Sequence, residues 1–71
     1  MTFEELWRHV GKLDLLPKQA IELVPQSLSD KTKKWLCMKK PEEVAEIVQW
    51  AIRQIDHGSI ETMDALVSRK L

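Results

Sequence analysis

The sequence predicts an all-α fold, a compact bundle of four to five short helices, for three reasons. Apolar residues recur at helical spacing along nearly the whole of the 71-residue chain. Three prolines and Gly58 stand where helices would begin or end. Sustained apolar–polar alternation and Asn-Gly or Asp-Gly turns are missing, so strands are not indicated. We expect residues 1–71 to form one small domain.

The first helix is expected from about Phe3 to Leu13. Thr2 is a favoured N-cap residue, and Glu5 follows it three positions later, as in a capping box. The inner face follows the i, i+3, i+4, i+7 pattern and comprises Phe3, Leu6, Trp7, Val10 and Leu13.

The second helix is expected to be short, from about Pro17 to Leu23 or Val24. It should stop before Pro25, because the residue that precedes a proline is pushed out of helical conformation. Ala20, Ile21 and Val24 lie on its apolar side.

The third helix should begin between Leu28 and Asp30 and end at Lys39, Lys40 and Pro41. Serine and aspartate are favoured N-cap residues, and several of them occur at its start. The inner face is predicted to comprise Leu28, Thr32, Trp35 and Leu36.

The fourth helix is expected to be the longest, from about Pro41 to Asp56 or His57, with Gly58 closing it. Acidic residues in its first turns suit the positive end of the helix dipole. Its apolar stripe comprises Val44, Ile47, Val48, Ala51, Ile52 and Ile55.

The fifth helix is expected to be capped by Ser59, with Ile60, Met63, Leu66 and Val67 facing inward. Across the whole chain, the most buried residues are predicted to include Leu6, Trp7, Val10, Val48, Ala51 and Ile55.

The composition indicates a cytoplasmic protein that does not span a membrane. The N-terminus is acidic and lacks the positive charge and apolar run of an export signal. No apolar run approaches the roughly 18 residues of a membrane span. The single cysteine, Cys37, rules out an internal disulfide, whereas small secreted domains usually contain several.

The cysteine and histidine residues of the sequence predict neither catalysis nor a metal or cofactor site. Cys37 has no adjacent base in the sequence, and His9 and His57 lie in different predicted helices, without metal-ligand spacing. The segment 58–64 resembles the serine segment of acyl carrier proteins, in which a serine that opens a helix receives phosphopantetheine. Gly58 replaces the aspartate that usually precedes that serine, so we interpret Ser59 as an N-cap and expect no cofactor.

A run of lysines is the strongest electrostatic feature of the sequence. Net charge is zero overall, but residues 31–40 hold five lysines and no acidic residue. Basic side chains beside an aromatic ring can bind phosphates and stack on a base. The candidate phosphate contacts are Lys31, Lys33, Lys34, Lys39 and Lys40, with Trp35 beside them.

A second candidate site centres on Trp50. On a helical wheel this residue lies beside Ile47 and to the side of the apolar stripe of the fourth helix. It is either covered by the bundle or exposed as an anchor for a partner or a second copy, because tryptophan is common at interface hot spots. The candidate partner contacts are Trp50, Ile47 and Gln54.

These features favour a non-enzymatic helical protein that acts through protein–protein contact, including contact with a second copy of itself. The alternative is a small nucleic-acid-binding or regulatory protein that uses the lysines of residues 31–40. Salt dependence separates the two, because phosphate binding weakens steeply with salt whereas an apolar interface does not.

Overall fold

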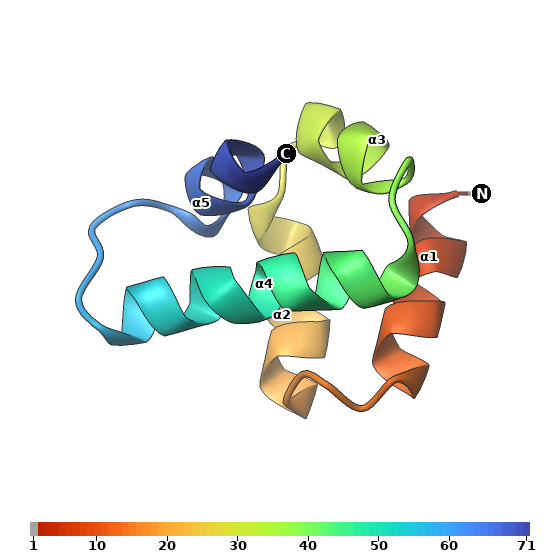
Figure 1. Ribbon diagram of the computed structural model, residues 1–71, viewed down its shortest axis with the longest axis horizontal. Coiled ribbons are helices and arrows are strands. Elements are labelled where there is room, and N and C mark those ends of the chain that lie inside the picture. Colours follow the sequence, from red (N-terminus) through yellow and green to blue (C-terminus); the bar gives the residue numbers. More distant parts are fainter. Residues whose placement is uncertain (1) are drawn as a thin grey trace.

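Five α-helices joined by short connections form the computed structural model, which describes residues 2–71 (Figure 1). No strand occurs in this range, and the predicted all-α bundle is confirmed. The globule measures 32 × 24 × 18 Å. The helices are α1 (Phe3–Lys12), α2 (Lys18–Ser27), α3 (Asp30–Leu36), α4 (Pro41–Asp56) and α5 (Met63–Lys70).

The long helix α4 is the central element, and its most extensive contacts are with α5 and α1. It runs across the width of the molecule in Figure 1, with α5 returning beside it. Every helix contributes to one apolar core. The buried apolar residues are Leu6, Trp7, Val10, Leu16, Val24, Leu28, Leu36, Val44, Ala45, Val48, Ala51, Leu66 and Val67.

The starts of α1 and α3 agree with the sequence. The Thr2 hydroxyl accepts the Glu5 backbone N–H at 3.2 Å, so the predicted cap of α1 is confirmed. The Ser29 hydroxyl accepts the Thr32 N–H at 3.3 Å and caps α3 within the predicted window. Helix α3 ends at Leu36, earlier than expected, because the turns that follow it close through tighter i→i−3 hydrogen bonds.

The predicted end of the second helix at Pro25 is wrong, since α2 continues to Ser27. A proline inside a helix lacks the N–H that would reach the carbonyl four residues earlier, which here belongs to Ile21. Trp7 of α1 supplies the missing donor: its indole Nε1–H donates to the Ile21 carbonyl at 2.8 Å. A side chain from a neighbouring helix therefore allows α2 to contain a proline.

The predicted end of the fourth helix at Gly58 is confirmed. Gly58 has a φ of 94°, in the left-handed region that glycine adopts at low cost. Its N–H donates to the Ile55 carbonyl at 3.0 Å, and the Ser59 N–H donates to the Gln54 carbonyl at 2.9 Å. This pair of bonds is the Schellman motif that closes helices.

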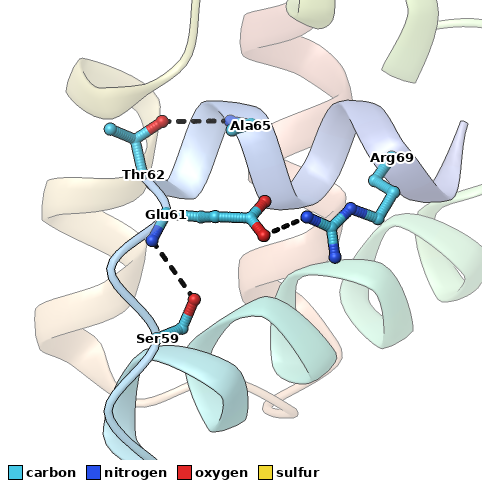
Figure 2. Close-up of polar contacts among 5 residues, drawn as sticks. All are labelled: Ser59, Glu61, Thr62, Ala65 and Arg69. Atoms are coloured by element: carbon cyan, nitrogen blue, oxygen red, sulfur yellow. Dashed lines mark hydrogen bonds and ion pairs between the residues drawn. The ribbon is translucent and has the colours of Figure 1, made fainter.

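The predicted role of Ser59 as the cap of the fifth helix is wrong. Thr62 caps α5, and its hydroxyl accepts the Ala65 N–H at 3.1 Å (Figure 2). Ser59 belongs to the end of α4, and its hydroxyl accepts the Glu61 N–H at 3.2 Å within the connection. Ile60 consequently lies in this connection, where its side chain is fully exposed rather than inward-facing.

The predicted core is confirmed at five of its six positions, because Leu6, Trp7, Val10, Val48 and Ala51 are buried. The prediction that Ile55 is buried is wrong, because this residue lies in the last turn of α4 and is exposed. The prediction that Trp35 lies on the inner face of its helix is also wrong, because its side chain on α3 is exposed. In both cases the periodicity was compatible with burial, but no neighbouring helix covers the side chain fully.

Candidate interaction surface

The five candidate lysines do not form one patch, because they lie on different sides of α3 and in the segment that follows it. Lys33 is half-buried, and its ammonium lies 5.4 Å from the centroid of the Phe3 ring on α1. Lys31 is exposed on another side of α3, over the Trp35 ring, and the exposed Lys34 also lines a hollow with Lys33. Lys40 is exposed at the start of α4, where it is the N-cap residue. The sequence predicted the basic run correctly, but the helical geometry divides it.

Two large apolar side chains lie among the lysines of the outer side of α3. Trp35 is 40% exposed and Met38 is 86% exposed. Trp35 follows Lys31 by four residues on one face of α3, and Met38, in the turn that follows α3, lines a hollow together with Trp35. The ammonium of Lys31 lies 5.0 Å from the centroid of the Trp35 ring, within cation–π range. We call Lys31, Lys34, Trp35, Met38 and Lys39 the α3 surface.

An open hollow adjoins this surface where α3 and α5 meet, near the C-terminus labelled in Figure 1. Its volume is about 410 Å³. No acidic side chain belongs to its lining. The lining residues are Trp35, Met38, Lys39, Ser68 and Leu71.

A polar network fixes α5 against α3 and thereby holds the two sides of this hollow. The Ser29 backbone N–H donates to the Asp64 carboxylate at 2.9 Å. The hydroxyls of Thr32 and Ser68 lie 3.1 Å apart, and the Ser68 hydroxyl donates to the Asp64 carbonyl at 2.8 Å. Thr32 is buried, so these bonds satisfy a polar group that would otherwise be unpaired in the core.

The connection before α5 is braced by a further polar contact. Figure 2 shows the Glu61 carboxylate pointing toward the Arg69 guanidinium, with which it forms an ion pair across α5. Both side chains are substantially solvent-exposed, so the pair contributes little to stability.

Replacing Asp64 with alanine is expected to lower the free energy of unfolding by about 1 kcal/mol near neutral pH. The Ser29 N–H, and after it the Thr32 hydroxyl, lower the pKa of the Asp64 carboxyl. Its contribution should therefore be present above the ordinary carboxyl pKa of 3.8 and disappear as the pH falls through the lower native value.

Urea unfolding of the Asp64→Ala variant at about pH 7 and at about pH 2 checks this expectation. Asp56→Ala is the control, since Asp56 is an exposed carboxylate at the end of α4. An equal loss of stability at both pH values would contradict the assigned role of the Asp64 charge.

The candidate partner contacts around Trp50 lie on one face of α4. Ile47, Trp50 and Gln54 are all half-buried, and the first two pack against the core. The ammonium of Lys70, in the last turn of α5, lies 4.6 Å from the centroid of the Trp50 ring. The returning helix α5 therefore covers part of this face, and contact with a partner remains a prediction.

The emission of Trp50 is expected to be blue-shifted and independent of protein concentration, because α5 and the core shield the ring. The measurement is the difference between the fluorescence spectra of the wild type and a Trp50→Phe variant. A shift that develops only as concentration rises would instead indicate self-association through Trp50.

Sequence reasoning missed an apolar groove between α2 and α4. Its volume is about 450 Å³, and Leu23 and Ile55 are exposed along it. The spacing of apolar residues does not predict this groove, because Leu23 lies outside the predicted apolar side of its helix and Ile55 is predicted to be buried in the core. The groove is lined by Pro17, Gln19, Ala20, Leu23, Val24, Ser27, Ile52, Ile55, Asp56 and Met63.

The chemically reactive side chains are dispersed. His9 and His57 are exposed, and Cys37 is half-buried. Within residues 2–71, no group of three or more histidine, cysteine, aspartate or glutamate side chains is placed to hold a metal ion. None of the helices in the described range is both long and apolar enough to cross a membrane.

The chain matches no protein-family model, and neither the curated proteins nor the solved structures compared with it give a significant match.

Proposed function

We propose that this chain is a small non-enzymatic domain that acts by binding another protein through the α3 surface. The observation that carries the proposal is the exposure of Met38 and Trp35 together, beside the hollow between α3 and α5. The single cysteine fits a reducing compartment, so we place this action in the cytoplasm.

Trp35 and Met38 would both contribute binding free energy when a partner covers them. Burying a large apolar side chain is worth roughly 1.5–3 kcal/mol, which the isolated domain does not fully gain at either position. Tryptophan is enriched among the residues that dominate interface energies. Methionine is flexible and polarisable, and it adapts to differently shaped partner surfaces.

The α3 surface supports this proposal better than the Trp50 surface does. Trp50 is half-buried, and Lys70 of α5 lies over its ring, whereas Met38 is almost entirely exposed. Ile47, Trp50 and Gln54 are kept as a secondary contact region, continuous with α5.

Nucleic-acid binding through the lysines is the second candidate, favoured by the exposure of Lys31 and Lys34 beside Trp35. A helix-turn-helix arrangement is not supported, because α3 packs mainly on α1 and α5 rather than on α2. The candidate is tested by titrating single-stranded and duplex oligonucleotides at about 150 mM salt, where non-specific binders typically reach dissociation constants of about 10⁻⁴–10⁻⁶ M.

The proposed function is tested by affinity capture with the tagged full chain from its native cells. We expect a Trp35→Ser, Met38→Ser double variant to lose a partner that the wild type captures. A Leu23→Ser, Ile60→Ser variant is the matched control, because it also replaces two exposed apolar residues, but away from the α3 surface.

Circular dichroism of both variants establishes that they remain folded. Retention of the same partners by the Trp35→Ser, Met38→Ser variant would overturn the proposal. Loss of those partners in the control variant alone would move the interaction away from the α3 surface, to the exposed side chains of Leu23 and Ile60.

A further inference from the structure

We infer that the partner segment bound by the α3 surface is acidic and amphipathic, with carboxylates facing the lysines and an apolar side chain entering the hollow between α3 and α5. The inference rests on the proposed function and specifies the chemistry of its partner. Its basis is the combination of charge and apolar area within one surface.

The charge of the α3 surface is unbalanced although the chain as a whole is neutral. Three lysines belong to it, and no acidic side chain lines the adjoining hollow. The Asp64 carboxylate of α5 is engaged by the Ser29 N–H. Asp30 lines a separate hollow with Lys33, Lys34 and Cys37, where the lysines outnumber it. Such local imbalance attracts and orients a partner of opposite sign.

The apolar part of the site defines the rest of the partner. Trp35, Met38 and Leu71 are the apolar residues that line the hollow. Its volume of about 410 Å³ can admit one or two apolar side chains. An acidic segment without an apolar anchor would leave Met38 and Trp35 uncovered, so both properties are required of the partner.

A nucleic acid fits the same surface less well. Binding of single strands relies on bases stacking on aromatic rings. The ammonium of Lys31 lies 5.0 Å from the centroid of the Trp35 ring and covers one of its faces. Lys33, which would extend the basic surface, is directed to Phe3 on α1. Met38 and Leu71 offer no interaction to a phosphate.

The test is fluorescence anisotropy with the full chain and a labelled helical peptide that carries leucines on one face and glutamates on the other. We expect binding that weakens at least about tenfold in a Lys31→Glu, Lys34→Glu variant, the change that a loss of about 1.4 kcal/mol produces. The same peptide with lysine in place of glutamate should bind at least about tenfold more weakly to the wild type.

The matched control is Lys12→Glu, Lys18→Glu. It changes net charge by the same amount at two exposed lysines near the α1–α2 connection. Its affinity for the glutamate–leucine peptide should stay within about twofold of the wild type. A Met38→Ser variant, altered at an exposed position that the fold does not need, should also weaken binding.

Absence of binding to the glutamate–leucine peptide overturns the inference. If polyglutamate binds as tightly as the glutamate–leucine peptide, the requirement for an apolar anchor is overturned. If Lys12→Glu, Lys18→Glu weakens binding as much as Lys31→Glu, Lys34→Glu does, the peptide is attracted by net charge alone, and the inference is overturned. Tighter binding of a single-stranded oligonucleotide that is lost in Lys31→Glu, Lys34→Glu assigns the surface to nucleic acid instead. A native partner that depends on Trp35 and Met38 but not on the lysines leaves the proposed function standing while this inference fails.

Discussion

Replacing Trp7 with alanine is expected to lower the free energy of unfolding by about 3–5 kcal/mol. The side chain is buried, stacks on Phe3 with ring centroids 5.6 Å apart, and donates a hydrogen bond to Ile21. A domain of this size has only a few kcal/mol of net stability, so much of the variant should be unfolded. Urea and thermal unfolding followed by circular dichroism provide the measurement.

The phenylalanine variant separates packing from the hydrogen bond. Trp7→Phe keeps an aromatic ring against Phe3 but leaves the Ile21 carbonyl without a donor, which should cost about 1–3 kcal/mol. In a Pro25→Ala background, the substituted alanine has a backbone N–H that can reach the Ile21 carbonyl along the helix. The cost of Trp7→Phe should then fall by about 1 kcal/mol.

A double-mutant cycle over these variants checks the coupling directly. If Trp7→Phe lowers the free energy of unfolding by the same amount in the wild type and in Pro25→Ala, the role assigned to the indole N–H is contradicted. Unchanged stability of Trp7→Ala would show that Trp7 is not packed in the core as described.

Replacing Leu66 with alanine is expected to destabilise the protein by about 2–5 kcal/mol. Leu66 is almost completely buried in α5, and the contact between α4 and α5 is the most extensive in the fold. The polar network of Asp64 and Ser68 is too small to hold α5 in place alone, because each of its bonds contributes about 1 kcal/mol. Loss of the Leu66 packing should therefore loosen both sides of the hollow beside the α3 surface.

Ile60→Ala is the matched control for this experiment, because it removes a similar amount of apolar side chain from a fully exposed position. Its free energy of unfolding should stay within about 0.5 kcal/mol of the wild type. Chemical unfolding of both variants, followed by circular dichroism, gives the comparison. A cost for Ile60→Ala as large as that for Leu66→Ala would contradict the burial assigned to the two residues.

Several features that one helical turn establishes were predictable from the sequence, although the cap of α5, Thr62, was missed. The caps Thr2 and Ser29 and the terminator Gly58 act through hydrogen bonds or dihedral angles within a few residues. The inner face of the first helix was predictable for the same reason, because a regular repeat defines one stripe. The sequence also located the lysine run and excluded an internal disulfide.

The tertiary structure decided whatever depends on a residue from another element. Pro25 lies inside α2 because Trp7 of a different helix supplies the missing donor. Periodicity assigns a side chain to a face of its helix, but burial also requires a neighbour over that face, and α5 covers Trp50 more completely than any helix covers Trp35. Helical geometry likewise places the lysines of residues 31–40 on two sides of α3. The hollow beside one of those sides exists only because α5 packs next to α3.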